Sequence, residues 1–168
     1  VAGGGTAGIC AAVSAARLGL KVALVHDRPV LGGNNSSEIR VHLGGVINCG
    51  PYPELGNIVK EFGHTKKGNA MPAGNYEDWK KDSLIASEPG ITLFREFRII
   101  RADMDGKRIK SLTAKNIRTG EQLRFKAPLF ADCTGVGNVG ALAGADFMTG
   151  RESREQTGEP GAVDVADS

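Results

Sequence analysis

The chain has 168 residues, a length typical of one domain, with 40% hydrophobic and 24% charged residues. Its formal net charge is only +2 and its basic residues alternate with acidic ones, which gives no indication of nucleic-acid binding. No apolar run approaches the roughly 20 residues that a membrane-spanning helix needs. The cellular compartment stays open, with the cytoplasm as the default expectation.

The three cysteines indicate neither a disulfide framework nor a metal site. Cys10, Cys49 and Cys133 are far apart and form no C-x-x-C pair. No group of histidines, cysteines and carboxylates has the spacing of metal ligands, and no Ser-His-Asp order is present. We therefore expect no bound metal.

The first predicted element is a glycine-rich turn with the spacing G-x-G-x-x-G, followed by a small-residue helix over 9–18. Gly3 allows a strand to turn sharply into the helix, and Gly5 admits a ligand phosphate to the backbone. Gly8 lets the helix pack close to the strand. The free N–H groups and the dipole of that helix favour an anion, so the pattern predicts a dinucleotide site.

A second strand is expected over 21–25, after Gly19, which suits a helix C-terminus. His26 and Asp27 stand at the end of this strand. In dinucleotide-binding folds an acidic side chain at this place binds the adenosine ribose. These features strengthen the prediction that the glycine turn binds a dinucleotide.

A glycine-containing loop over 28–33 and a polar segment over 34–45 come next. The segment either lines a site or caps a helix, because Ser36 and Ser37 before Glu38 also fit N-cap chemistry. Arg40 and His42 are two residues apart. On a strand they would share a face and could serve an anionic or proton-accepting site, although an ordinary surface pair is the alternative.

The middle of the chain, about 46–90, is predicted to be a helical insertion of weak structure. Helices are expected over 53–63 and 76–87, the second with Asn75 as its N-cap. Trp79 is interpreted as a packing residue on the apolar face of that helix.

The rest of the chain is predicted to be mostly strands. An antiparallel β-meander is expected within about 95–127, because its strands alternate and Asp-Gly and Thr-Gly turns separate them. A buried strand over 127–131 then leads to a second glycine-rich turn over 132–138 and a helix over 139–143. The predicted strands of this half are 91–94, 97–104, 108–117, 122–125 and 127–131.

Both ends of the chain suggest a piece of a longer protein. Only two residues precede Gly3, whereas a parallel strand usually has about five or six. We therefore expect the first strand to be incomplete. The segment 151–168 is rich in Gly, Pro, Glu and Asp, and we interpret it as a truncated linker or the start of a further segment.

Four segments together resemble the FAD-dependent oxidoreductases of the two-dinucleotide-binding-domain flavoprotein superfamily. They are the glycine turn 3–8, the Leu-Gly-Gly loop 28–33, the Ser-Ser-Glu-Ile-Arg-Val segment 36–41, and the turn 132–135 with the small residues 141–145. The resemblance covers nearly the whole chain. It implies an α/β fold over 1–150, a Rossmann-like FAD/NAD(P)-binding domain with a parallel sheet plus the antiparallel β-meander.

The resemblance also implies FAD as the cofactor and a set of residues that bind it. The first glycine turn would hold the pyrophosphate, the 32–33 pair would pass along it, the polar 34–37 segment would lie towards the flavin ring, and the second turn would close over the cofactor. The implied residues are Gly3, Gly5, Thr6, Ala7, Gly8, His26, Asp27, Arg28, Gly32, Gly33, Asn34, Ser36, Ser37, Thr134 and Gly135.

Two positions depart from the family pattern. The ribose-binding acid usually stands where this chain has His26, and an aspartate often stands in the second turn where this chain has Val136. An imidazole still donates or accepts a hydrogen bond, so the acid's role passes to His26, to Asp27 or to water.

The function implied is flavin-mediated hydride transfer to or from a small-molecule substrate that the sequence does not identify. An NAD(P)-binding Rossmann dehydrogenase is the second hypothesis, but such a chain would continue with alternating strands and helices instead of a meander. A cofactor-free structural or binding module is the third. Val136 favours it and the intact glycines oppose it. The oligomeric state stays open.

Overall fold

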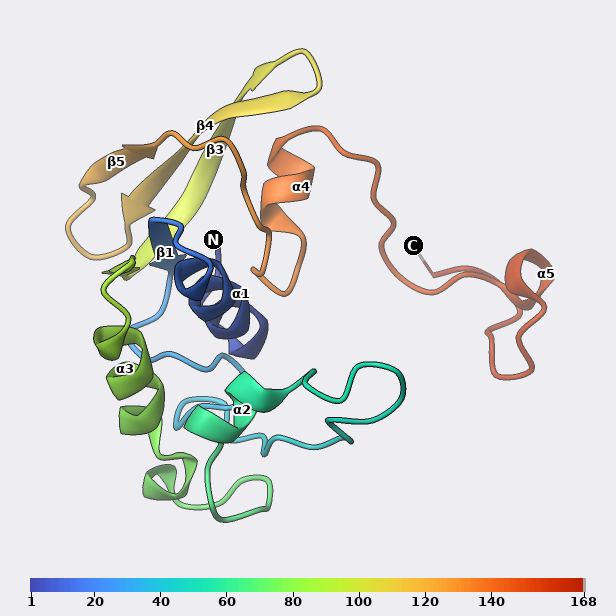
Figure 1. Ribbon diagram of the computed structural model, residues 1–168. Coiled ribbons are helices and arrows are strands. Elements are labelled where there is room, and N and C mark those ends of the chain that lie inside the picture. Colours follow the sequence, from blue (N-terminus) through green and yellow to red (C-terminus); the bar gives the residue numbers. More distant parts are fainter. Residues whose placement is uncertain (168) are drawn as a thin grey trace.

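The computed structural model describes residues 1–167 and has a mixed α/β architecture (Figure 1). The strands are β1 Val22–His26, β2 Ile91–Arg95, β3 Phe97–Asp105, β4 Arg108–Asn116 and β5 Gln122–Phe125. The helices are α1 Thr6–Arg17, α2 Asn57–Phe62, α3 Asp78–Ser87, α4 Asn138–Leu142 and α5 Arg154–Thr157, with a 3₁₀ helix η1 at Ala73–Tyr76.

A small parallel sheet lies at the centre of the fold. β1 pairs with β2, and the register places Val22 opposite Ile91. Ala2 forms parallel bridges to Val25 on one side and to Asp132 on the other. The glycine turn, the end of β1 and the second glycine-rich turn therefore lie at one end of the sheet, where ligands bind in doubly wound folds.

The alternation of side chains along β1 divides the interior into two cores. Val22 and Leu24 belong to the core on the helical side, together with residues of α1, α2 and α3. Val25 points to the other side and joins a core formed with the β-meander and α4. Because successive strand residues face opposite ways, one short strand supports both layers, with helices on one side and the meander on the other (Figure 1).

The segment between β1 and β2 supplies core residues and connects two parallel strands, which need a crossover. Phe62 of α2 is fully buried, and Leu84 and Ile85 of α3 pack into the same core. At the end of α1, Arg17 binds Glu61 and Glu88, each at 2.7 Å. This exposed cation also complements the dipole at the helix C-terminus, and it links α1 to both neighbouring helices.

The meander confirms the prediction of three antiparallel strands. β3 pairs with β4, and β4 pairs with β5. Gly106 and Gly120 provide the positive φ angles, 57° and 79°, that the two tight turns require. Phe94 of β2 meets Phe125 edge-on at a centroid distance of 4.9 Å, which joins the parallel sheet to the meander.

The predicted strand over 127–131 is wrong. This segment forms no strand, and the side chain of Leu129 is 79% exposed. The segment leads to Asp132, which forms a single bridge with Ala2 beside the parallel sheet. One bridge does not extend into a ladder, so the apolar run stays in an irregular, mostly exposed conformation.

The predictions of Trp79 as a packing residue and of Asn75 as an N-cap are also wrong. Trp79 is 62% exposed, whereas Lys81 is completely buried. Leu84 and Ile85 lie three and four positions after Lys81, so they share its face of α3, and Trp79 lies on the opposite face. The helix begins at Asp78 with Glu77 at the N-cap position, because the preceding residues form η1.

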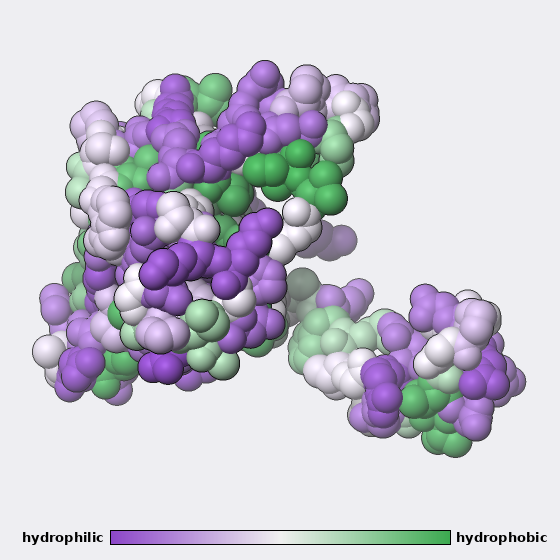
Figure 2. Space-filling view, turned by 90° about the horizontal axis from the view of Figure 1, so that it is seen from below, coloured by the Kyte–Doolittle hydropathy of each residue, from purple (hydrophilic) through white to green (hydrophobic). Residues whose placement is uncertain are grey.

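The chain after α4 leads away from the body to α5 (Figure 1). The predicted loop over 151–168 contains this short helix, which begins with a capping box between Ser153 and Gln156. The body's surface seen from below is largely hydrophilic, with apolar residues gathered in a hollow (Figure 2). Within residues 1–167 we find no helix with both the length and the apolar character needed to cross a membrane.

We predict that Gly8→Ala destabilises the fold by about 3 kcal/mol. A Cβ at this position would lie 1.8 Å from the carbonyl oxygen of Gly3, so α1 would have to move away from the turn. Gly74→Ala is the matched control, because no atom lies within 4 Å of its added Cβ, and it should change stability by less than about 0.5 kcal/mol. Urea denaturation measures both values, and equal stability of the two variants would contradict the packing role of Gly8.

Candidate functional site

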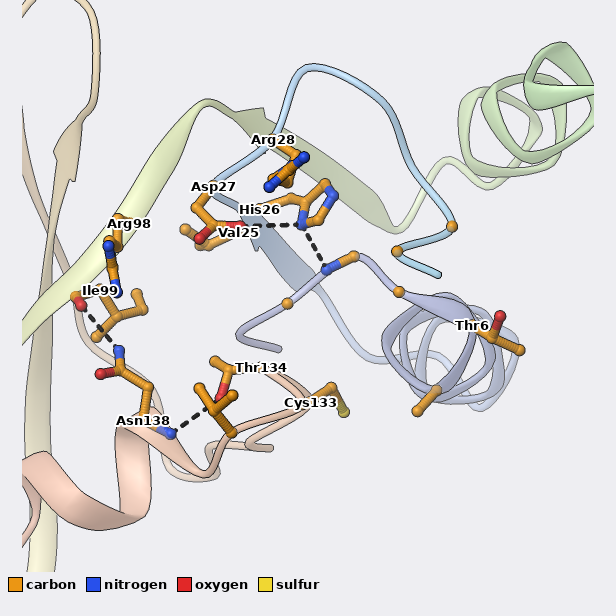
Figure 3. A pocket seen from close by; sticks show the side chains of 18 of the residues that line it. Thr6, Val25, His26, Asp27, Arg28, Arg98, Ile99, Cys133, Thr134 and Asn138 are labelled. Atoms are coloured by element: carbon orange, nitrogen blue, oxygen red, sulfur yellow. Dashed lines mark hydrogen bonds and ion pairs between the residues drawn. The ribbon is translucent and has the colours of Figure 1, made fainter. Parts of the chain in front are cut away.

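A cavity of about 690 Å³ lies where the glycine turn, the loop after β1 and the second glycine-rich turn meet (Figure 3). It opens at the carboxyl ends of the parallel strands, the expected position of a ligand in this architecture. Twelve of the predicted cofactor-binding residues line it: Gly3, Gly5, Thr6, Ala7, His26, Asp27, Arg28, Gly32, Gly33, Asn34, Thr134 and Gly135.

The three glycines of the first turn have different structural roles. Gly3 has a φ of 98°, and a Cβ there would lie 2.2 Å from the carbonyl oxygen of Cys133. Gly8 is required for the contact between α1 and the turn, and it does not line the cavity. Gly5 has an extended backbone that any residue adopts, with φ −70° and ψ −177°. The nearest atom to its added Cβ, the Cα of Gly33, is 4.0 Å away, so packing does not require glycine there.

The beginning of α1 leaves backbone donors for a ligand. Its N-cap residue is Gly5, which has no side chain to accept a hydrogen bond, and the first turn contains no acidic residue. The N–H groups of Thr6 and Ala7 precede the first i to i−4 bond of the helix, and both residues line the cavity. This helix of 12 residues thus presents N–H groups and its positive dipole end to the cavity.

His26 is buried, with only 5% of its surface exposed, and both ring nitrogens contact backbone groups. The N–H of Gly4 donates to Nδ1 at 3.0 Å (Figure 3). The other ring nitrogen, Nε2, lies 2.9 Å from the carbonyl oxygen of Val30. Burial lowers the pKa of the imidazole, and the Val30 carbonyl and the Asp27 carboxylate work against this shift. The ring edge reaches the cavity, but its nitrogens are used within the protein.

Asp27 and Arg28 extend the wall of the cavity beyond β1. The Asp27 side chain is 46% exposed, and its Oδ1 lies 3.8 Å from Nδ1 of His26. The Nε of Arg28 donates to Glu38 at 2.9 Å, and this hydrogen bond raises the pKa of the guanidinium. Of the two predicted ribose ligands, Asp27 therefore presents the more accessible hydrogen-bond acceptor.

The second turn is organised by Asp132. One carboxylate oxygen accepts hydrogen bonds from the N–H and hydroxyl of Thr134, and the other accepts from the N–H groups of Val139 and Gly140 at 2.8 and 3.0 Å. Burial opposes ionisation, but these hydrogen bonds together hold the pKa of Asp132 below its usual range. The carboxylate fixes Thr134 and Gly135 in position and caps α4.

Most of the polar segment 34–37 supports the cavity from outside. Asn34 lines the cavity, but the Ser36 hydroxyl donates to the carbonyl of Gly33 at 2.7 Å and is completely buried. The N–H of Ser37 donates to the carboxylate of Asp78 at 3.2 Å. Ser36 thus holds the Gly32–Gly33 loop and Ser37 joins the segment to α3, and neither lines the cavity, which their residue types alone did not reveal.

A buried lysine lies beneath this loop. The ammonium of Lys81 donates to the carbonyl of Tyr76 at 2.7 Å and lies 3.3 Å from Asp78. Burial lowers the pKa of this ammonium group. The aliphatic part of the side chain fills the space beneath Gly32, where a Cβ would lie 2.8 Å from the Cε of Lys81.

Arg40 and His42 do not lie on a strand, since residues 40–42 form none and Arg40 has a φ of 65°. The Nε of Arg40 donates to the Ser37 carbonyl at 3.0 Å, and Nδ1 of His42 lies 2.8 Å from Oδ1 of Asn69. Neither residue lines the cavity.

Several residues of the cavity were not predicted. β3 contributes Phe97, Arg98 and Ile99, and the amide of Asn138 donates to the carbonyl of Ile99 at 2.9 Å (Figure 3). These strand residues follow the crossover and carry no motif, so the alternating pattern predicted the strand but not its position beside the cavity. The other unpredicted residues are Gly4, Val25, Ile39, Cys133 and Val136.

Residues 1–167 match the family model described as FAD dependent oxidoreductase. The chain belongs to this family. The match spans the glycine turn, the loop after β1, the meander and the second turn, and it indicates FAD as the cofactor. No curated protein sequence matches this FAD dependent oxidoreductase chain.

Solved structures confirm the fold of this family member. A flavoprotein/dehydrogenase from Cytophaga hutchinsonii is 20% identical, with a TM-score of 0.58 over 90% of this chain and 42% of that one. A 3-ketosteroid-delta4-(5alpha)-dehydrogenase from Rhodococcus jostii RHA1 is 15% identical, with a TM-score of 0.52 over 75% and 43%. THI4 from Thermovibrio ammonificans is 18% identical, with a TM-score of 0.52 over 91% and 62%. The chain thus spans less than two thirds of each of these proteins.

We predict that Asp132→Ala destabilises this FAD dependent oxidoreductase chain by about 1–2 kcal/mol. The variant leaves the N–H groups at the start of α4 and in the second turn without their acceptor. Asp146→Ala, at an exposed position just after α4, is the control and should stay within about 0.5 kcal/mol of the original chain. Denaturant unfolding compares the two, and a loss confined to Asp146→Ala would contradict the role of Asp132.

Proposed function

We propose that the cavity binds FAD and that the protein catalyses flavin-mediated hydride transfer to or from a small-molecule substrate. The observation that carries the proposal is the open position at Gly5. Its backbone conformation and its packing permit a side chain, yet a side chain would enter the cavity between the start of α1 and Gly33. Glycine at such a position fits close approach of a pyrophosphate to the backbone.

The residues around the cavity suit the parts of FAD. The N–H groups of Thr6 and Ala7 would donate to pyrophosphate oxygens, since they lie at the positive end of α1. Asp27 would accept a hydrogen bond from the adenosine ribose in place of His26. Arg98 adds a cation to the same wall and complements the charge of the phosphates.

FAD supplies the hydride chemistry when bound, and the chain supplies position and surroundings. The Gly32–Gly33 loop and the second turn would hold the cofactor on two sides and exclude water from between them. Asn34 lines the cavity and belongs to the polar segment that we propose lies towards the flavin ring. A catalytic role of Arg40 and His42 stays a hypothesis, and it requires a substrate that reaches their loop.

The proposal treats residues 1–150 as the FAD-binding domain, with 46–90 as its crossover insertion and 95–127 as its β-meander. Residues 151–168 would then be a linker or the start of a further segment, of which the structure describes 151–167. Family membership and the layered arrangement of the body support this division. The substrate and any partner would be determined in part by regions of the longer relatives that this chain does not span.

The test is to record the visible absorbance spectrum of the purified protein, and then to titrate the cofactor-free form with FAD and with NAD. We expect a flavin spectrum and saturable FAD binding. NAD binding without flavin would instead favour a Rossmann dehydrogenase. No binding of either nucleotide to the longest natural form of the protein would favour a cofactor-free module and overturn the proposal.

We predict that Gly5→Ala lowers FAD affinity by at least about tenfold while the fold remains intact. The added methyl group enters the cavity, but its nearest neighbour is 4.0 Å away. Fluorescence titration gives the affinity and thermal unfolding gives the stability, with Gly74→Ala as the matched control. Unchanged affinity in Gly5→Ala would contradict the assignment of the pyrophosphate to this turn.

We also predict that Asp27→Ala lowers FAD affinity by about tenfold, since it removes one charged hydrogen-bond acceptor for a ribose hydroxyl. Asp105→Ala, at the distant turn between β3 and β4, is the control and should bind FAD like the original chain. Isothermal calorimetry with FAD measures both. Equal affinities would show that Asp27 has no part in ribose binding.

A further inference from the structure

We propose that His26 is a positioning residue whose neutral imidazole, in one fixed tautomer, holds the first glycine turn against the 28–33 loop. The effect on the fold is independent of any ligand. The effect on cofactor affinity rests on the proposed function above, because it acts through the turn that would bind the FAD pyrophosphate.

The two hydrogen bonds of His26 determine where its proton lies. The backbone N–H of Gly4 is only a donor, so Nδ1, at 3.0 Å, must be the unprotonated acceptor. The carbonyl oxygen of Val30 is only an acceptor, so Nε2, at 2.9 Å, must carry the hydrogen. A protonated ring would place a second N–H against that of Gly4. Only the neutral Nε2–H form satisfies both partners.

The position of the ring makes it a direct link between two loops. His26 ends β1 on the same face as Val22 and Leu24, so its side chain points beneath the glycine turn. A Cβ on Gly4 would lie 2.8 Å from Cγ of His26, which shows how closely the ring packs there. The carbonyl of Gly4 accepts from the N–H of Gly32 at 2.8 Å, so Gly4 is held by the His26 ring through its N–H and by the 28–33 loop through its carbonyl.

The charged groups near His26 do not favour a second proton strongly enough to overcome burial. Burial lowers the pKa of the imidazole, and the Arg28 guanidinium acts in the same direction. The Val30 carbonyl and the carboxylates of Asp27 and Glu38 act in the opposite direction, and Glu38 is itself paired with Arg28 at 2.9 Å.

Two further cations contact the loops around the ring. Arg95 of β2 donates to the carbonyl of Pro29 at 2.8 Å and to Asp82 of α3 at 2.6 Å. Lys81 of α3 lies beneath Gly32. Each of these cations is paired with a carboxylate, Arg95 with Asp82 and Lys81 with Asp78.

The chemistry explains why a histidine serves here and a carboxylate does not. A carboxylate accepts the Gly4 N–H but cannot donate to the Val30 carbonyl, and it would repel that oxygen. A glutamine amide provides one acceptor and one donor without titrating. His26 thus forms a hydrogen bond with each loop, and both of its ring nitrogens are used. Under the proposed function, the ribose binds Asp27 instead.

The sign of the pH dependence follows from the lowered pKa. Above pH of about 6.5, the ordinary value for histidine, the ring is neutral in both the folded and unfolded states, and its contribution to stability is fully present. As the pH falls below this value, the unfolded state takes up the proton first, and the contribution is lost as the pH approaches the lowered folded-state pKa.

The first experiment is a long-range ¹H–¹⁵N NMR spectrum of the full chain without FAD, with His26 assigned by comparison with His26→Gln. We expect the His26 ring to be in the Nε2–H tautomer. We also expect it to stay neutral at the pH where the histidines of a denatured sample are half protonated. A signal from the Nδ1–H tautomer, or a charged ring at that pH, would overturn the proposal whether or not the protein binds FAD.

The second experiment measures FAD affinity from about pH 8 to about pH 5. The original chain should lose about tenfold in affinity at the acidic end, the equivalent of one buried hydrogen bond. His26→Gln, whose amide does not titrate, should lose less than about twofold in affinity between pH 8 and pH 5, whatever its affinity at pH 8. His64→Gln, which changes a histidine outside the cavity, should keep the original pH profile.

The paired outcomes separate the two proposals. If neither the original chain nor any variant binds FAD, the proposed function fails. The role of His26 is then decided by the tautomer of the original chain and by comparing the pH dependence of its unfolding with that of His26→Gln. If FAD binds but the original chain and His26→Gln have the same pH profile, the positioning role fails. His26→Leu, which has neither donor nor acceptor, should bind weakly at every pH, and full binding by this variant would also overturn the proposal.

Discussion

The fold depends on the close contact between the start of α1 and the glycine turn that precedes it. Gly8 lies directly against the carbonyl of Gly3, and Gly3 lies against the backbone of Cys133. These contacts leave no room for a side chain, so three backbone segments meet at one point. The cavity is the space that remains beside this point, and its shape follows from backbone packing more than from any side chain.

Around this point the protein uses its polar groups mainly to support loops. Asp132 holds the second turn, Ser36 and Lys81 support the Gly32–Gly33 loop, and His26 joins that loop to the first turn. Each of these side chains forms a hydrogen bond with at least one backbone group. At the start of α1 the backbone N–H groups of Thr6 and Ala7 are left for a ligand in the cavity, which suits a ligand that carries phosphates.

Two neighbouring residues at the end of β1 have different surroundings. His26 is buried and supports the loops, and Asp27 is accessible beside it. The His26 ring accepts one hydrogen bond from the first turn and forms a second with the 28–33 loop.

The sequence by itself determined the glycine turn, α1, β1 and the three strands of the meander, because glycine spacing and side-chain alternation are local properties of the chain. It also indicated the family and FAD through motifs that combine such local patterns. Tertiary structure decided which polar residues face the cavity: Asn34 does, whereas Ser36 is buried and His42 lies elsewhere. It also placed Arg98 in the wall and left 127–131 without a strand. Burial and pairing depend on segments distant in sequence, and no local pattern contains that information.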